Sequence, residues 1–117
     1  MTQRIEVKIV DDVTVASTLD MKLNEDLAIQ EWGDQLIALF DDAACKKLLV
    51  SFERVLFMSS SALRALITLN KKAKEIKASL VLCGIDDNIM EAFRITRLDN
   101  VLRIRKNEEE GMSAFGC

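Results

Sequence analysis

The stretch KLLVSFERVLFMSSSAL, residues 47–63, decides the fold that the sequence predicts. Its first part, Lys47 to Phe52, carries the apolar block Leu48-Leu49-Val50, which is typical of a central strand covered on both faces. A short connector then leads to three serines, which open a helix predicted over 61–77, because apolar residues recur there at helical spacing. A buried strand that runs through a connector into a helix indicates an α/β layer structure.

The N-terminal segment predicts a hairpin. Ile5, Val7 and Ile9 alternate with charged residues, which is the period of a half-buried strand. The pair Asp11-Asp12 forms a tight turn into a second strand over 13–19. We therefore expect the two strands to pair antiparallel at the start of the chain.

The remaining elements follow from capping residues and apolar spacing. We expect a helix from an Asn24 cap to about Asp42 with close packing at Gly33, a strand over 80–83, a helix capped by Asp86 or Asp87, a strand over 101–104, and a terminal helix capped by Asn107 that runs through Phe115. The predicted fold is α/β, a central mixed sheet opened by the N-terminal hairpin, with four to five helices packed on it. We expect a single domain over residues 1–117, because this length holds one core.

Composition narrows the partners and the compartment. Half of the residues are hydrophobic and 30% are charged, as in a folded globular protein. A net charge of −3 favours neither nucleic acid nor an anionic membrane, so we expect neither as a direct partner. The N-terminus has no signal-peptide core, and Cys45, Cys83 and Cys117 suit free thiols in a reducing compartment. These features predict a cytoplasmic protein.

The sequence gives little support to enzyme chemistry. It has no histidine, which excludes Ser-His-Asp and Cys-His catalytic units and the common Cys/His zinc sites. It also lacks the glycine-rich loops that cradle nucleotides. The paired acids at 11–12, 41–42 and 86–87 lie at element boundaries, where turns and caps explain them. Cys83 lies in an apolar strand, which favours an inert thiol. We predict that the chain is no enzyme and binds no metal or cofactor.

The three serines allow two interpretations. A serine in front of a helix commonly caps it, since the hydroxyl accepts a hydrogen bond from one of the unpaired N–H groups. The same N–H groups and the helix dipole also favour a phosphate at that position. Three consecutive serines behind two apolar residues, Phe57 and Met58, favour the second interpretation more than a single serine would.

Two segments resemble the STAS domain, the fold of sulfate transporters and anti-sigma factor antagonists. Residues 48–63 are similar to the strand, connector and helix start that in the family usually end in Asp-Ser-Ser-Gly-Leu. Residues 93–102 are similar to the family's Thr-Gly-Leu-Asp segment, which leads into the last strand. Ser59 stands in place of the family Asp, and Ala62 in place of the family Gly.

The resemblance implies a partner switch. Antagonists of this family bind an anti-sigma factor that is a serine kinase, and phosphorylation of the first serine after the family Asp breaks the complex. That serine is Ser60 here, with Ser59 and Ser61 as the alternatives beside it. The resemblance and the expected exposure of the loop predict a partner-binding surface, whose residues are Phe57, Met58, Ser59, Ser60, Ser61, Ala62, Arg64, Asp20 and Asn24.

Three functions remain open at this point. The first is an anti-sigma factor antagonist that binds an anti-sigma factor of serine-kinase type and is controlled at Ser60. The second is an unswitched STAS interaction or scaffold module in a signalling or transport accessory complex. The third is a binder of small molecules or nucleotides, or an enzyme of unrecognised type, which the missing catalytic residues disfavour. For the chain itself we expect a monomer or a weak homodimer.

Overall fold

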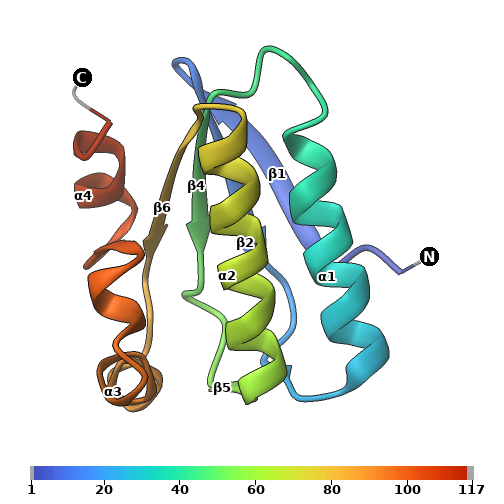
Figure 1. The fold of residues 1–117 in the computed structure, drawn as a ribbon, viewed down its shortest axis with the longest axis vertical. Helices are drawn as coiled ribbons and strands as arrows, with labels where there is room; N and C mark the ends of the chain where they lie inside the picture. Colours follow the sequence, from blue (N-terminus) through green and yellow to red (C-terminus); the bar gives the residue numbers. More distant parts are fainter. Residues whose placement is uncertain (1, 116–117) are drawn as a thin grey trace.

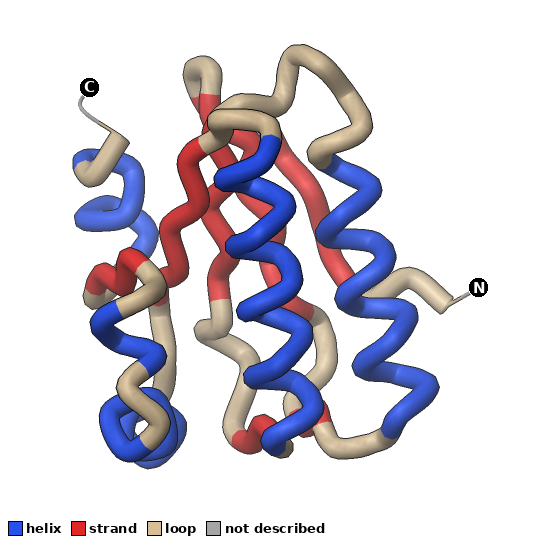
Figure 2. The backbone as a smooth tube through the Cα atoms, viewed as in Figure 1, coloured by secondary structure: helices blue, strands red, loops and turns tan. Residues whose placement is uncertain are grey.

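A computed structural model describes residues 2–115 of the chain and shows helices packed against a central sheet (Figures 1 and 2). In order, the elements are β1 (Ile5–Val10), β2 (Val13–Thr18), β3 (Lys22–Leu23), α1 (Asp26–Leu39), β4 (Lys47–Ser51), β5 (Phe57–Met58), α2 (Ser60–Glu75), β6 (Ser79–Cys83), α3 (Asp87–Ile95), a 3-10 turn (Leu98–Asn100), β7 (Arg103–Arg105) and α4 (Glu108–Ser113).

The central sheet is mixed, as predicted, and has the strand order β1-β2-β4-β6-β7. β1 and β2 form the predicted antiparallel hairpin, in which Val10 pairs with Val13 across the turn and Asp11 adopts a positive φ of 57°. β2, β4, β6 and β7 are parallel to one another. The strand over 47–51 is therefore the middle strand of the sheet.

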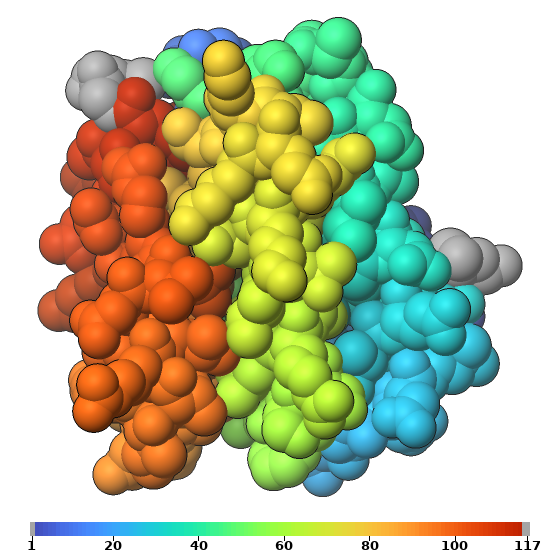
Figure 3. Space-filling model, viewed as in Figure 1, coloured from blue at the N-terminus to red at the C-terminus, as the bar shows by residue number. Residues whose placement is uncertain are grey.

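Helices cover both faces of the sheet. α1, α2 and α3 share one apolar core with Leu48 and Val50 of β4. α4 covers the other face, where Met112 packs on a smaller core that includes Leu49 and Val81. Figure 3 shows α2 running down the middle of the first face, between α1 and the C-terminal segments. Because β4 is buried on both sides, its side chains read as a continuous apolar block.

Trp32 ties α1 to the sheet. Its indole Nε1 donates a hydrogen bond of 3.1 Å to Oγ1 of Thr18, a buried hydroxyl at the end of β2. Its ring meets the Phe52 ring edge to face, with the centroids 6.1 Å apart. Thr18 pairs the indole N–H and Phe52 packs against the indole ring. These two contacts fix α1 against the sheet.

Several predicted boundaries are wrong by a few residues. α1 ends at Leu39 rather than near Asp42. Its N-cap position is Glu25, so Asn24 does not cap it. The terminal helix ends at Ser113 rather than Phe115. The last strand is Arg103–Arg105, because Val101 and Leu102, at the start of the predicted strand, close the 3-10 turn through hydrogen bonds to the Leu98 carbonyl. Helix ends fray and switch to other turns, which apolar spacing does not reveal.

The predicted caps of the later helices are confirmed. The Asp86 carboxylate accepts a hydrogen bond of 3.0 Å from the Asn88 N–H. The Asn107 side chain accepts one of 2.9 Å from the Glu110 N–H. The two-stranded ladder of β3 and β5 was not predicted, because each strand has only two residues. Cys117 lies outside the described residues.

We expect alanine substitutions at two helical glycines to change the stability of the fold in opposite directions. In α4, a Cβ on Gly111 would lie 2.6 Å from Leu49 Cδ1, so Gly111→Ala should destabilise the fold by about 1–3 kcal/mol through overpacking. In α1, a Cβ on Gly33 would lie 3.7 Å from the Ala65 Cβ, an ordinary contact, so Gly33→Ala should stabilise the fold by about 0.5–1 kcal/mol. Urea unfolding of both variants measures the two effects. Equal midpoints would contradict the close approach of α4 to β4.

Candidate functional site

The segment after β4 forms a loop that a second loop supports. We call residues 56–61 the serine loop. Its backbone pairs with the segment that follows β2: the Leu56 N–H donates to the Met21 carbonyl at 2.7 Å, and the Ser59 N–H donates to the Leu23 carbonyl at 2.9 Å. β3 and β5 pair parallel between these two bonds, with Lys22 opposite Phe57. The structure thus brings together the two loops that the sequence assigned to one surface.

The three serines occupy different environments. Ser59 holds the N-cap position of α2 in an extended conformation, but its hydroxyl makes no capping bond. Its Oγ is buried and has no hydrogen-bond partner among the described residues. Ser60 is exposed in the first turn of α2, and Ser61 is half-buried. The Ser59 side chain therefore does not cap α2. Of the three serines, Ser60 is the most accessible from solvent.

The helix N-terminus and nearby cations set the charge around Ser60. The first N–H groups of α2 point toward the loop, and no acidic residue occupies the first turn to offset their partial positive charge. Arg64 is exposed one turn further along the same side of the helix, and Lys22 is exposed on the neighbouring strand. A negative group on Ser60 would be stabilised by this environment.

Four of the nine residues predicted to bind a partner are exposed, three are half-buried and two are buried. Phe57, Arg64 and Asn24 are exposed. Met58 and Ala62 are buried, because β5 alternates its side chains and α2 turns the Ala62 side toward the core. The prediction that their side chains form part of the surface needs correction: they support the loop from below.

Asp20 is engaged within the molecule. Its carboxylate lies 2.9 Å from the Arg4 guanidinium, which also binds Glu31 of α1 at 3.0 Å. This half-buried cluster joins the N-terminus, the loop after β2 and α1. Asp20 thus holds the supporting loop in place, and a partner would meet a carboxylate that is already paired.

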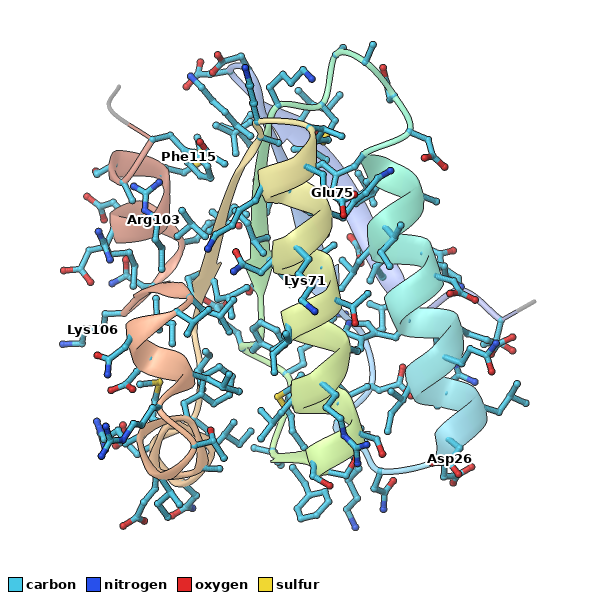
Figure 4. The ribbon with its side chains drawn as sticks, viewed as in Figure 1. Asp26, Lys71, Glu75, Arg103, Lys106 and Phe115 are labelled. Atoms are coloured by element: carbon cyan, nitrogen blue, oxygen red, sulfur yellow. The ribbon has the colours of Figure 1, made fainter. Side chains whose placement is uncertain are left out.

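Exposed apolar side chains form a rim at the end of the molecule that carries the serine loop, and the sequence predicted only Phe57 among them. Met21 and Leu56, whose backbones are hydrogen-bonded to each other, are both exposed. Phe57 beside them is 49% exposed, and Leu27 is exposed in the first turn of α1 at the same end of the molecule (Figure 1). Asp26, labelled in Figure 4, marks that end of α1. Exposed apolar residues that gather in this way are typical of protein-binding surfaces. Leu27 lies outside the buried stripe of α1, and this position in the sequence could have indicated an exposed apolar residue.

The described residues lack a cluster for metal binding. Residues 2–115 contain no group of three Cys, Asp or Glu side chains placed to hold a metal ion. Burial raises the pKa of the Cys83 thiol to about 11, so the thiol is protonated near neutral pH. Within the same range, no helix combines the length and apolarity of a membrane span.

Comparison with known families identifies the fold. The family model described as the STAS domain matches residues 6–111, which include the serine loop, the helices on the first face, and all of the sheet and α4 except the first residue of β1 and the last two of α4. The chain belongs to the STAS domain family. This match confirms the predicted resemblance, and the solved relatives share the mixed sheet that the sequence predicted.

Individual STAS proteins resemble the chain at modest identity. BtrV of Bordetella bronchiseptica, provisionally named an anti-sigma factor antagonist, is 23% identical over 74 residues, which cover 63% of this chain and 64% of BtrV. An anti-sigma-factor antagonist domain protein from Planctomyces limnophilus is 25% identical, with a TM-score of 0.82 over 94% of this chain and 95% of its own. The Bacillus antagonist SpoIIAA in its phosphorylated form shares the fold, with 16% identity and a TM-score of 0.70 over 95% and 98%.

The unpaired hydroxyl of Ser59 leads to a stability prediction. Ser59→Ala removes a buried hydroxyl without breaking a hydrogen bond, so the free energy of unfolding should stay unchanged or rise by up to about 1 kcal/mol. Asp86→Ala is the matched control, because its carboxylate does cap α3, and its loss should cost about 0.5–2 kcal/mol. Thermal and urea unfolding measure both. A clear loss of stability in Ser59→Ala would mean that the hydroxyl is bonded in solution.

Proposed function

We propose that this STAS protein is an anti-sigma factor antagonist that binds an anti-sigma factor of serine-kinase type through the serine loop and is released when Ser60 is phosphorylated. The observation that carries the proposal is the exposure of Ser60 in the first turn of α2, next to the apolar rim of Met21, Leu27, Leu56 and Phe57. The names of BtrV and of the Planctomyces protein, and the phosphorylated form of SpoIIAA, support it. The proposal assigns no catalytic step to the chain and places it in the cytoplasm.

The proposed switch acts on docking rather than on folding. A phosphate on Ser60 would add roughly −1.5 to −2 charges at neutral pH. Within the domain, the N-terminus of α2 and Arg64 would stabilise that charge, so the fold would remain intact. A partner that covers the apolar rim would have to bury the phosphate beside apolar side chains, which carries a large desolvation cost. Phosphorylation would therefore weaken the complex.

One observation favours the unswitched adaptor as a second candidate. The family Asp is Ser59 in this chain, and its hydroxyl is buried beneath the loop. A kinase that reads a carboxylate next to the modified serine would find none at this position. In that case the same apolar rim would bind a protein partner without control at Ser60.

Affinity capture separates the two candidates. Wild-type, Ser60→Asp and Ser60→Ala baits are incubated with native lysate, and the retained proteins are identified by mass spectrometry. The switch predicts that wild type and Ser60→Ala retain a sigma-regulating kinase, and that Ser60→Asp loses it by at least about tenfold, since a charge is introduced into the interface. Thr68→Asp places the same charge on an exposed position two turns along α2 and should retain the kinase. Equal retention by all four baits would support the adaptor instead.

The apolar rim makes a separate prediction. Phe57→Ala should weaken binding of the captured partner about tenfold or more, because exposed aromatic residues near the centre of an interface contribute strongly to affinity. Val101→Ala is the matched control: Val101 is 50% exposed, close to the 49% of Phe57, but follows the 3-10 turn two residues before the edge strand β7. Isothermal titration with the purified partner measures both. Equal affinities would place the interface elsewhere.

A further inference from the structure

The edge strand β1 is exposed and carries apolar side chains on one face. β1 forms one end of the sheet, and only Ile5 of its six residues is buried. Val7 is 44% exposed and Ile9 is 73% exposed, and both lie on the face of the sheet that carries Ile5. α1 reaches this strand near its start, where Gln35 accepts a hydrogen bond from the Arg4 N–H. The rest of the strand remains open to solvent.

The backbone of β1 offers hydrogen-bonding groups on its open side. The Leu19 N–H donates to the Arg4 carbonyl, and antiparallel ladders bond every second residue, so Glu6 and Lys8 bond to β2. Val7 and Ile9 therefore direct their N–H and C=O groups away from β2. The Ile5 carbonyl also points away from β2, because it accepts a hydrogen bond of 2.8 Å from the Gln3 side-chain amide.

The opposite edge of the sheet is protected, which sets β1 apart. β7 has only three residues, and two of them are exposed arginines. Arg103 donates to the Ala114 carbonyl and so joins the strand to the end of α4. Figure 4 shows Arg103 and Lys106 on this flank. Short strands and cations are common protections against edge-to-edge pairing. β1, with six residues and exposed Val7 and Ile9, lacks such protection on its apolar face.

We propose that β1 pairs antiparallel with β1 of a second copy of this chain, about a two-fold axis at Val7. In this register Val7 faces Val7 of the second copy, Ile5 faces Ile9, and Glu6 faces Lys8. Ile5, Val7 and Ile9 direct their backbone groups outward and form the hydrogen-bonded pairs of the new ladder, in which the Ile9 N–H of the second copy replaces the Gln3 amide at the Ile5 carbonyl. Glu6 and Lys8 form the non-hydrogen-bonded pairs, in which side chains approach most closely.

Charge selects this register among its neighbours. A shift by two residues in one direction places Glu6 opposite Glu6 of the second copy, and a shift in the other direction places Lys8 opposite Lys8. Like charges directly opposite each other are unfavourable in antiparallel sheets, and opposite charges are favourable. In the proposed register, Glu6 of each copy faces Lys8 of the other, which gives two opposite-charge pairs. The apolar residues of both strands lie on one face.

The present partners of Glu6 and Lys8 leave them available. Lys8 lies 3.3 Å from Glu108 and Glu6 lies 3.9 Å from Arg54; Lys8, Glu6 and Arg54 are exposed, and Glu108 is half-buried. Ion pairs of this kind contribute little and exchange readily. A six-residue strand buries less area than a standard protein interface, so the dimer should be weak and depend on concentration.

Charge exchange in β1 tests the proposal. Sedimentation velocity from low micromolar to near-millimolar concentration should show a reversible wild-type dimer. Glu6→Lys and Lys8→Glu should each weaken dimerisation about tenfold, because attraction becomes repulsion in two symmetric pairs. The double variant restores both pairs and should dimerise like wild type, and an equimolar mixture of the two single variants should form a heterodimer. Arg105→Glu, on β7, serves as the control and should leave the dimer unchanged.

Two results would overturn the proposal: a wild-type chain that stays monomeric throughout, or single variants that dimerise as well as wild type. Thermal unfolding verifies that every variant is folded. The proposal does not depend on the switch at Ser60, because capture of a partner by the serine loop and sedimentation of the purified chain are independent measurements.

A cysteine on the two-fold axis gives a second test. In a Cys117→Ser background, Val7→Cys places two thiols at a spacing that allows a disulfide, since hydrogen-bonded antiparallel pairs have Cα atoms about 5.5 Å apart. Mild oxidation should give a covalent dimer from Val7→Cys. Ile9→Cys should give much less, because it faces Ile5 of the second copy. The native thiols Cys45 and Cys83 are buried. Equal cross-linking of the two variants would exclude this register.

Discussion

The burial of β4 on both faces is the constraint on which the rest of the structure depends. Leu48 and Val50 lie beneath α1 and α2, while Leu49 lies beneath α4. A strand covered in this way must be apolar on both sides and must sit in the middle of the sheet. The chain leaves the sheet at the carboxyl end of β4, and the connector over 52–59 leads back into α2. The serine loop thus follows a strand that is buried on both faces.

The phase of α2 determines which serine faces the solvent. The helix buries Leu63, Leu66 and Leu69 against the sheet, and this leaves Ser60 exposed one turn before them. The core side of the helix supplies its stability, so a change of charge at Ser60 alters the surface with little effect on packing. A domain built in this way suits control of docking by modification, because fold and binding surface respond to different residues.

The two proposed binding surfaces use different parts of the sheet. The serine loop and its apolar rim lie where strands end and helices begin, and they would bind a partner through side chains. β1 lies at the lateral edge and would bind a second copy through its backbone, with Glu6 and Lys8 selecting the register. Separate surfaces allow a dimer to present two serine loops, which would raise the effective concentration of one loop after the other has bound.

The sequence by itself determined the hairpin, the central strand, the helix after the serines and the caps at Asp86 and Asn107, because these depend on local periodicity and on hydrogen bonds within a few residues. Only the tertiary structure decided the burial of Met58, the pairing of Asp20 with Arg4, and the unbonded hydroxyl of Ser59. It also decided the two-residue ladder that joins the loops, and the apolar rim. These features join residues far apart in the chain, and their energies depend on which surfaces meet in three dimensions, which no local pattern records.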